Sequence, residues 1–151
     1  MSTVVQLVGI LLVALVVGVY WGPWVALTRS IARLDVEIFL PIVKQLNANL
    51  AGLMTVLVPL ALLAQVGMLV VGFGRGPLSF TLAAIALLLF IVTVVVTVLT
   101  EVPIVKQVVT WEVETVPANW RVLRDRWVSF HLLRVIPGIA ALGLYVVAAL
   151  S

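Results

Sequence analysis

The sequence predicts an all-α integral membrane protein, an antiparallel four-helix bundle with an amphipathic segment after the first helix. Two observations carry this prediction. Hydrophobic residues make up 64% of the 151 residues and charged residues only 10%, whereas soluble domains average roughly 45–50% and about 25%. Apolar segments also recur four times along the chain, at lengths close to the ~20 residues that a membrane-crossing helix needs.

Composition also excludes several classes of function. The chain has no cysteine and one histidine, so we expect no disulfide, no metal site and no cofactor. The net charge of +3 is too small to indicate a nucleic-acid partner, because basic residues beside apolar runs more often set topology. We therefore expect a single transmembrane domain over residues 1–151, surrounded by membrane lipids.

The first predicted span covers residues 4–27. Its apolar length exceeds that of a signal peptide, and no basic leader or small-residue cleavage site accompanies it, so we expect a retained helix. Gly22-Pro23 can break or kink the helix near its end. Three aromatic side chains lie there, at the expected depth of the lipid headgroups: Tyr20, Trp21 and Trp24.

Residues 28–48 are predicted to form the amphipathic segment at the membrane surface, because apolar residues recur there at helical spacing. The second span covers residues 49–73 and holds Pro59 near its middle, where a proline removes one backbone hydrogen bond. A short turn rich in glycine leads into the third span, residues 78–100. Glu101 follows that span at once.

The fourth apolar run, residues 135–150, is shorter than a full span. It reaches span length only if its helix begins near Asn119, so we predict a span over residues 119–150. At ~100° per residue, one face of this helix then carries a polar stripe: Trp120, Arg124, Trp127, His131 and Arg134. A cation facing lipid costs at least ~2.5–3.5 kcal/mol near the bilayer centre, so this stripe should face the bundle interior or a wet cavity. Asp125 lies off the stripe and is expected to pair with Arg121.

The polar stripe allows two interpretations. In one, Glu101 is the counter-charge of Arg124 or Arg134 in an interhelical clamp, and the protein is a non-catalytic subunit or scaffold that packs against a larger protein partner or a copy of itself. In the other, the cytoplasmic end of the bundle binds a lipophilic small molecule, His131 accepts a proton, and the arginines hold an anionic or phenolic group. The clamp predicts solid packing around Trp127 and His131, whereas the pocket predicts a cavity.

The distribution of lysine and arginine predicts the orientation. Basic residues gather in the first loop and the third, while the second loop has Arg75 alone. By the positive-inside rule, the first and third loops face the cytoplasm and both termini lie on the non-cytoplasmic side of the cell membrane. The basic residues of those two loops are Arg29, Arg33, Lys44, Lys106, Arg121, Arg124 and Arg126.

The chain also resembles the anthrone-oxygenase-like family of small four-helix membrane proteins. The C-terminal half carries the more specific pattern: Glu101-Val-Pro-Ile, Gln107, Trp111, Thr115-Val-Pro, Trp120, Arg124-Asp-Arg-Trp127, Phe130-His131 and Arg134. The N-terminal half carries a second set: Gly18-Val-Tyr-Trp-Gly-Pro-Trp24, Thr28-Arg-Ser, Phe39-Leu, Asn47 with Asn49, and Met54 with Pro59. The likeness therefore covers nearly the whole chain.

This resemblance implies an oxidoreductase that converts a polycyclic phenolic anthrone to an anthraquinone with molecular oxygen and without a recognised cofactor. Together with the polar stripe, it predicts catalytic roles for His131, Arg134 and Glu101. It also implies substrate-binding roles for a further set of side chains: Trp120, Arg124, Trp127, Trp111 and Asn49. The chain departs from the family pattern at Val105-Lys106, where a small polar pair would be expected.

Overall fold

The structure is a computed structural model that describes residues 2–151. Helices account for nearly all of these residues, and no strand lies among them. The α-helices are α1 (Ser2–Pro23), α2 (Val36–Arg75), α3 (Pro77–Val96), the short α4 (Val102–Val108) and α5 (Trp120–Leu150). Short helical turns connect them: η1 (Trp24–Thr28), η2 (Ile31–Arg33), η3 (Thr97–Glu101) and η4 (Val113–Thr115).

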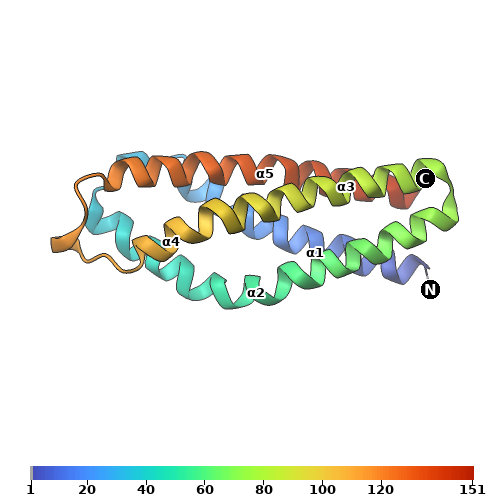
Figure 1. Cartoon of the computed structure of the whole chain (residues 1–151), viewed down its shortest axis with the longest axis horizontal. Coiled ribbons are helices and arrows are strands. Elements are labelled where there is room, and N and C mark those ends of the chain that lie inside the picture. Colours follow the sequence, from blue (N-terminus) through green and yellow to red (C-terminus); the bar gives the residue numbers. More distant parts are fainter. Residues whose placement is uncertain (1) are drawn as a thin grey trace.

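The helices form an antiparallel bundle with both termini at one end (Figure 1). Within residues 2–151, four helical segments are long and apolar enough to cross a membrane: Thr3–Arg33, Val36–Arg75, Pro77–Val108 and Trp120–Leu150. Large apolar side chains cover the outer surface, which suits contact with lipid and not with water. The predicted all-α bundle is thus confirmed, and the chain has the character of a multi-pass membrane protein.

The amphipathic segment after the first helix leads directly into the second span, because its second half is the start of α2. Asp35 has an extended backbone and its carbonyl accepts the N–H of Phe39, which starts α2 at Val36. From there α2 runs without a break through Pro41 and on into the apolar span. Phe39 and its neighbours on the apolar face are buried against the other helices. Packing of that face therefore continues the helix upstream of the predicted boundary at residue 49.

Close helix contacts hold the bundle at the end where the termini lie. A Cβ built on Gly72 of α2 would lie 3.2 Å from the carbonyl oxygen of Ser79 on α3, so the two backbones nearly touch there. The Ser79 hydroxyl donates to the carbonyl of Ala148 on α5 over 2.8 Å. In the same half of the bundle, the buried Tyr145 hydroxyl donates to Oε1 of Gln65 over 2.6 Å. These hydrogen bonds satisfy polar groups in a region where lipid offers no partners.

Candidate functional site

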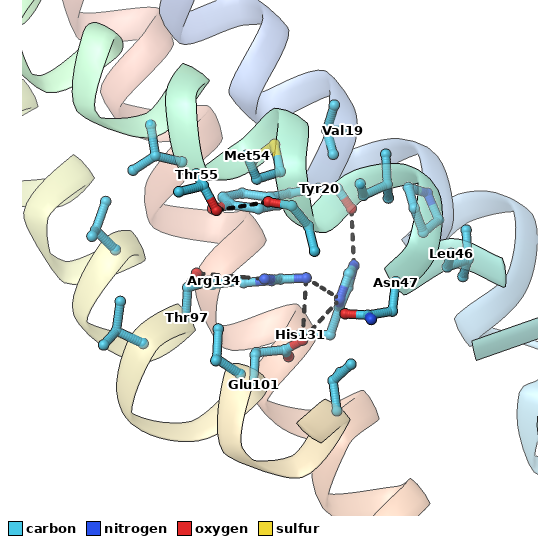
Figure 2. A pocket seen from close by; sticks show the side chains of 18 of the residues that line it. Val19, Tyr20, Leu46, Asn47, Met54, Thr55, Thr97, Glu101, His131 and Arg134 are labelled. Carbon is cyan, nitrogen blue, oxygen red and sulfur yellow. Dashed lines mark hydrogen bonds and ion pairs between the residues drawn. The ribbon is translucent and has the colours of Figure 1, made fainter. Parts of the chain in front are cut away.

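A cavity of about 600 Å³ lies inside the other half of the bundle, toward the first and third loops. All four membrane-spanning segments contribute to its wall (Figure 2). Its volume falls within the ~300–1,000 Å³ typical of small-molecule sites. Apolar side chains form most of the wall. The polar side chains that matter for chemistry are Tyr20, Asn47, Thr97, Glu101, His131 and Arg134.

Glu101, His131 and Arg134 meet on one side of this cavity. Nη2 of Arg134 lies 3.1 Å from Oε2 of Glu101 and 2.8 Å from Nδ1 of His131. The three side chains expose only 3%, 2% and 11% of their surface, respectively. A charge shielded to this degree needs its partner, because water cannot replace it. Of the two arginines expected to pair with Glu101, the structure thus selects Arg134.

The hydrogen bonds of His131 determine its tautomer. Nε2 lies 2.9 Å from the carbonyl oxygen of Tyr20, and a carbonyl can only accept, so Nε2 carries the proton. Nδ1 faces the guanidinium of Arg134, which can only donate, so Nδ1 is the unprotonated nitrogen of a neutral ring. Both ring nitrogens are therefore occupied while Arg134 stays in place.

The spacing along α5 brings the cavity residues of this helix together. Trp127, His131 and Arg134 are separated by four and three residues, so they lie on one face of the helix. That face points into the bundle, as the polar stripe predicted, and it continues to Gly138, which packs near Thr93 of α3. The small Gly138 lets α3 and α5 approach just beyond the cluster.

Glu101 reaches the cluster through a π-helical turn. In η3 the N–H of Val102 donates to the carbonyl of Thr97, five residues back. Pro103 follows directly and has no N–H to donate. A π turn inserts one extra residue and shifts the helix face by about 100°. Glu101 at the end of this turn is buried, whereas Leu99 is 70% exposed on the outside.

Tyr20 completes the cluster from α1. The guanidinium carbon of Arg134 lies 4.2 Å from the centroid of the Tyr20 ring, a cation–π arrangement that also shields the charge. Thr97 adds a longer contact, with Oγ1 3.4 Å from Nη1 of Arg134. Tyr20 was expected in an aromatic belt at the membrane surface, but it is only 4% exposed. Tyr20 follows the buried Val16 and Val17 at helical spacing, so it lies on the same inward face. Sequence alone does not identify that face, because the helix is apolar on every side.

Three buried polar atoms beside the cavity have no hydrogen-bond partner within the described chain. They are Oε1 of Glu101, Nε of Arg134 and Nε1 of Trp127. In residues 2–151 this state is shared by one further buried side-chain atom, Nε2 of Gln65 in the other half of the bundle. Each such atom costs about 1–3 kcal/mol unless something occupies it. Two N–H donors and one carboxylate oxygen beside the cavity are therefore available to form hydrogen bonds with a polar group of a ligand or with water.

Two residues of the predicted stripe lie outside the cavity. Trp120 stacks on Phe39 of α2, with ring centroids 5.6 Å apart. Nη2 of Arg124 lies 2.8 Å from Oδ1 of Asp125, and Nη1 donates to the carbonyl of Ala32 over 3.3 Å. These contacts tie the start of α5 to α2 and to the first loop, so they hold together the end of the bundle that carries the loops.

The predicted pairing of Asp125 with Arg121 is wrong. Arg124 is buried and needs a counter-charge, and the carboxylate of the adjacent residue is within reach. Arg121 instead places its guanidinium carbon 4.8 Å from the centroid of the Trp120 ring. The buried cation therefore takes the carboxylate, and the exposed cation stacks on an aromatic face.

Two side chains implied by the resemblance also lie away from the cavity. Trp111 is half-buried in the connection after α4, where it packs against a buried apolar cluster that includes Ile104 and Val108. Asn49 is exposed and accepts a hydrogen bond from Nε2 of Gln45 over 3.0 Å. Asn47 lines the cavity instead, because residues two apart point to different sides of a helix. Figure 2 shows Asn47 reaching inward beside His131.

The pair that departs from the family pattern does line the cavity. Val105 and Lys106 lie on α4, within the part of the wall nearest the third loop. Lys106 is exposed and Val105 is partly buried. Among residues 2–151, no group of three or more His, Cys, Asp or Glu side chains is placed to hold a metal ion.

Comparison with known proteins adds a family match. A family model described as anthrone oxygenase matches residues 45–144, about two thirds of the chain. The matched range begins within α2 and ends within α5, so it includes Glu101, His131 and Arg134 but not Tyr20. No curated protein and no solved structure matches the chain.

Proposed function

Because the chain belongs to the anthrone oxygenase family, we propose that its cavity binds a lipophilic small molecule and that the protein oxidises a polycyclic phenolic substrate with molecular oxygen. One observation carries this proposal. An apolar cavity of about 600 Å³ meets a buried cluster of Glu101, His131 and Arg134 in which polar atoms remain unpaired. A flat ring system fits the apolar wall, and its oxygen substituents match the free donors.

The unpaired atoms suggest a role for each side chain. Nε of Arg134 and Nε1 of Trp127 are donors, suited to an oxyanion that forms on the ring. Oε1 of Glu101 is the unpaired acceptor, so we assign to it the role of the base that removes a proton from the substrate. His131 was expected to take this proton, and it could do so only after Arg134 had released Nδ1. The contact between Arg134 and Nδ1 supports a positioning role for His131, and the unpaired oxygen of Glu101 supports its role as the base.

In the proposed reaction, molecular oxygen oxidises a methylene group of the substrate to a carbonyl group. The base removes a proton from a methylene carbon that is acidic because its carbanion is delocalised into the ring ketone. The carbanion gives an electron pair to oxygen, and a carbon–oxygen bond forms as a peroxide. The peroxide takes up the first proton, and the base then removes the second hydrogen of that carbon as a proton. The electron pair of that C–H bond forms the carbonyl as the oxygen–oxygen bond breaks, and the hydroxide that leaves takes up the second proton and becomes water. Burial of Arg134 beside the cavity favours the anionic states through which this sequence passes.

The alternative, a non-catalytic scaffold, predicted solid packing around Trp127 and His131. Both residues instead line a cavity. A purely structural clamp would also be expected to pair its buried polar atoms, because each unpaired atom lowers stability, whereas three are unpaired here. These two observations favour a binding site over a scaffold.

We also propose that the cavity lies toward the cytoplasm and that both termini lie outside. Both termini are at one end of the bundle (Figure 1), and the basic residues of the first and third loops are at the other. The chain has no cysteine, so a cysteine placed at Ser151 can be labelled without background. A reagent that cannot cross the membrane should label it in intact cells, and labelling only after lysis would reverse the orientation.

The function is tested in two steps. Native mass spectrometry of protein extracted gently from its own membrane should show a bound small molecule, and Arg134→Met should lose it. Protein in lipid nanodiscs should then consume oxygen and form anthraquinone from anthrone faster than empty nanodiscs do. The matched control is Leu99→Ala, which alters the lipid-facing surface next to the cluster. A clean apo mass together with a rate equal to that of empty nanodiscs would contradict the proposal.

A further inference from the structure

The cavity has a side opening between α2 and the stretch formed by η3 and α4. Several lining residues of both walls are also exposed on the outside of the bundle. On the η3–α4 side, Val98 is 56% exposed and Val102 is 38% exposed. On the α2 side, the rim consists of Ala51, Thr55 and Pro59. A residue that lines a cavity and is also exposed outside marks a place where the cavity is open.

The opening exists because α2 is held to its neighbours at both ends and separates from them between. Near one end, Gly72 brings α2 against the backbone of α3 at Ser79. Near the other end, Nζ of Lys44 lies 2.9 Å from Oε1 of Glu112, which follows α4. Between these contacts α2 bows away from α3 and α4 (Figure 1). Pro59 lies in the bowed part, and a proline inside a helix is a common cause of bending.

The outer surface around the opening is apolar. The side chains that neighbour the opening there are large, among them Val56 and Leu63 on α2, which are 60% and 68% exposed. The exposed cation Lys106 lies toward the third loop, roughly 12 Å along the helix from Val98 at 1.5 Å per residue. The outer surface around Val98 is thus apolar and suits contact with acyl chains, whereas the lysine suits the headgroup layer.

We propose that the cavity is filled sideways from the bilayer, through the opening between α2 and the η3–α4 stretch. Its ligand is then a flat hydrophobe dissolved in the membrane, with a hydroxyl or ketone group that reaches the polar cluster. Such a molecule keeps its apolar body in contact with acyl chains as it enters, and it never crosses the headgroup layer. Small side chains at the rim, such as Ala51, leave the way open. Oxygen, which is apolar, enters by the same route.

This inference rests on the proposed binding site but not on the oxygenase chemistry, so it is tested by binding alone. The probe is anthraquinone, a flat ketone that quenches tryptophan fluorescence. Protein in lipid vesicles is mixed rapidly with it, and the quenching component that Trp127→Phe removes reports entry into the cavity. The absence of cysteine allows single reactive sites. Val98→Cys places one on the rim, and Leu99→Cys places one on the adjacent lipid-facing surface as the matched control.

Each cysteine variant is compared before and after reaction with N-cyclohexylmaleimide, which adds bulk but no absorbance. Modification at position 98 should slow entry by roughly tenfold or more, because it obstructs the opening, and should slow release through the same opening by a similar factor. Modification at position 99 should change neither. A third variant, Lys106→Cys, probes the end of the cavity nearest the third loop.

Two results would overturn the inference. If modification at position 106 slows entry while modification at position 98 does not, the ligand comes from the water side, and the binding site itself stands. If no form of the protein shows the Trp127-dependent component, the proposed binding site fails along with its entrance. Slowing at position 98 without slowing at position 99 supports the side entrance directly.

Discussion

Nη2 of Arg134 lies 2.8 Å from Nδ1 of His131 and so occupies the one ring nitrogen that could accept a proton. The other ring nitrogen already donates to the carbonyl of Tyr20. The carboxylate of Glu101, bound to the same Nη2 through one oxygen, keeps its second oxygen unpaired. This division supports the proposal that Glu101 is the base and that His131 positions Arg134, and the two roles can be separated by mutation.

Glu101→Gln should lower kcat for anthrone oxidation by about 10²–10⁴, the usual contribution of a positioned base. His131→Gln should lower it by less than about tenfold, because a glutamine amide can still donate to the Tyr20 carbonyl and accept from Arg134. The measurement is oxygen uptake at saturating anthrone for both variants in nanodiscs. Equal, large losses of kcat in the two variants would contradict this assignment and indicate that His131 is the base.

Arg134→Met should destabilise the protein strongly, by about 3–5 kcal/mol, because it leaves Glu101 buried without a counter-charge. The double variant Arg134→Met with Glu101→Gln should recover much of this loss, since neither charge then remains. Unfolding of the detergent-solubilised protein would be followed by circular dichroism during titration with a denaturing detergent. A double variant less stable than the single would show that the pair does not interact as described.

Arg124→Ala should lower stability without changing anthraquinone affinity. The side chain holds the start of α5 through Asp125 and the carbonyl of Ala32, outside the cavity. Losing a buried, charge-assisted contact costs about 1.5–3 kcal/mol. The same unfolding assay and equilibrium quenching of Trp127 would measure the two effects. A weakened affinity with unchanged stability would restore the substrate-binding role that the sequence predicted for Arg124.

Gly72→Ala should destabilise the bundle by about 1–3 kcal/mol, because the new methyl group meets the backbone of α3 and not a side chain that could move. Gly74→Ala is the matched control on the same helix, since nothing lies within 4 Å of a Cβ there. That control should be neutral or slightly stabilising, by up to about 1 kcal/mol of helix propensity. Equal effects in the two variants would mean that α2 and α3 do not touch at Gly72.

Much of the site on α5 could be predicted from spacing. Trp127, His131 and Arg134 recur at four and three residues, and charged residues inside a membrane must face inward. The same rule also selected Arg124, which is buried but serves the end of the bundle and not the cavity. Periodicity reports which face of a helix is buried, and it cannot report what lies opposite that face.

The remaining cavity residues could not be predicted in this way. Tyr20 lies on a helix whose faces are nearly uniform in hydropathy, so spacing gives no direction there. Asn47 lies near the end of the amphipathic segment, where apolar spacing predicts burial of hydrophobic residues and gives no reason for a polar side chain to face inward. Glu101 was expected to be a counter-charge, but its place in the cluster depends on the π turn that precedes Pro103. A turn of this kind depends on local backbone packing, and it leaves no periodic pattern in the sequence.

The sequence by itself determined the number of membrane helices, their antiparallel order and the inward face of α5, because the lack of hydrogen-bond partners in lipid allows few other arrangements for so apolar a chain. The tertiary structure alone decided that α2 separates from α3 and α4 and leaves a cavity beside Glu101 and Arg134. It also decided that Arg134 contacts the unprotonated nitrogen of His131. The physical reason is that hydropathy acts on each helix separately, whereas cavities and charge pairs depend on how different helices bend and meet.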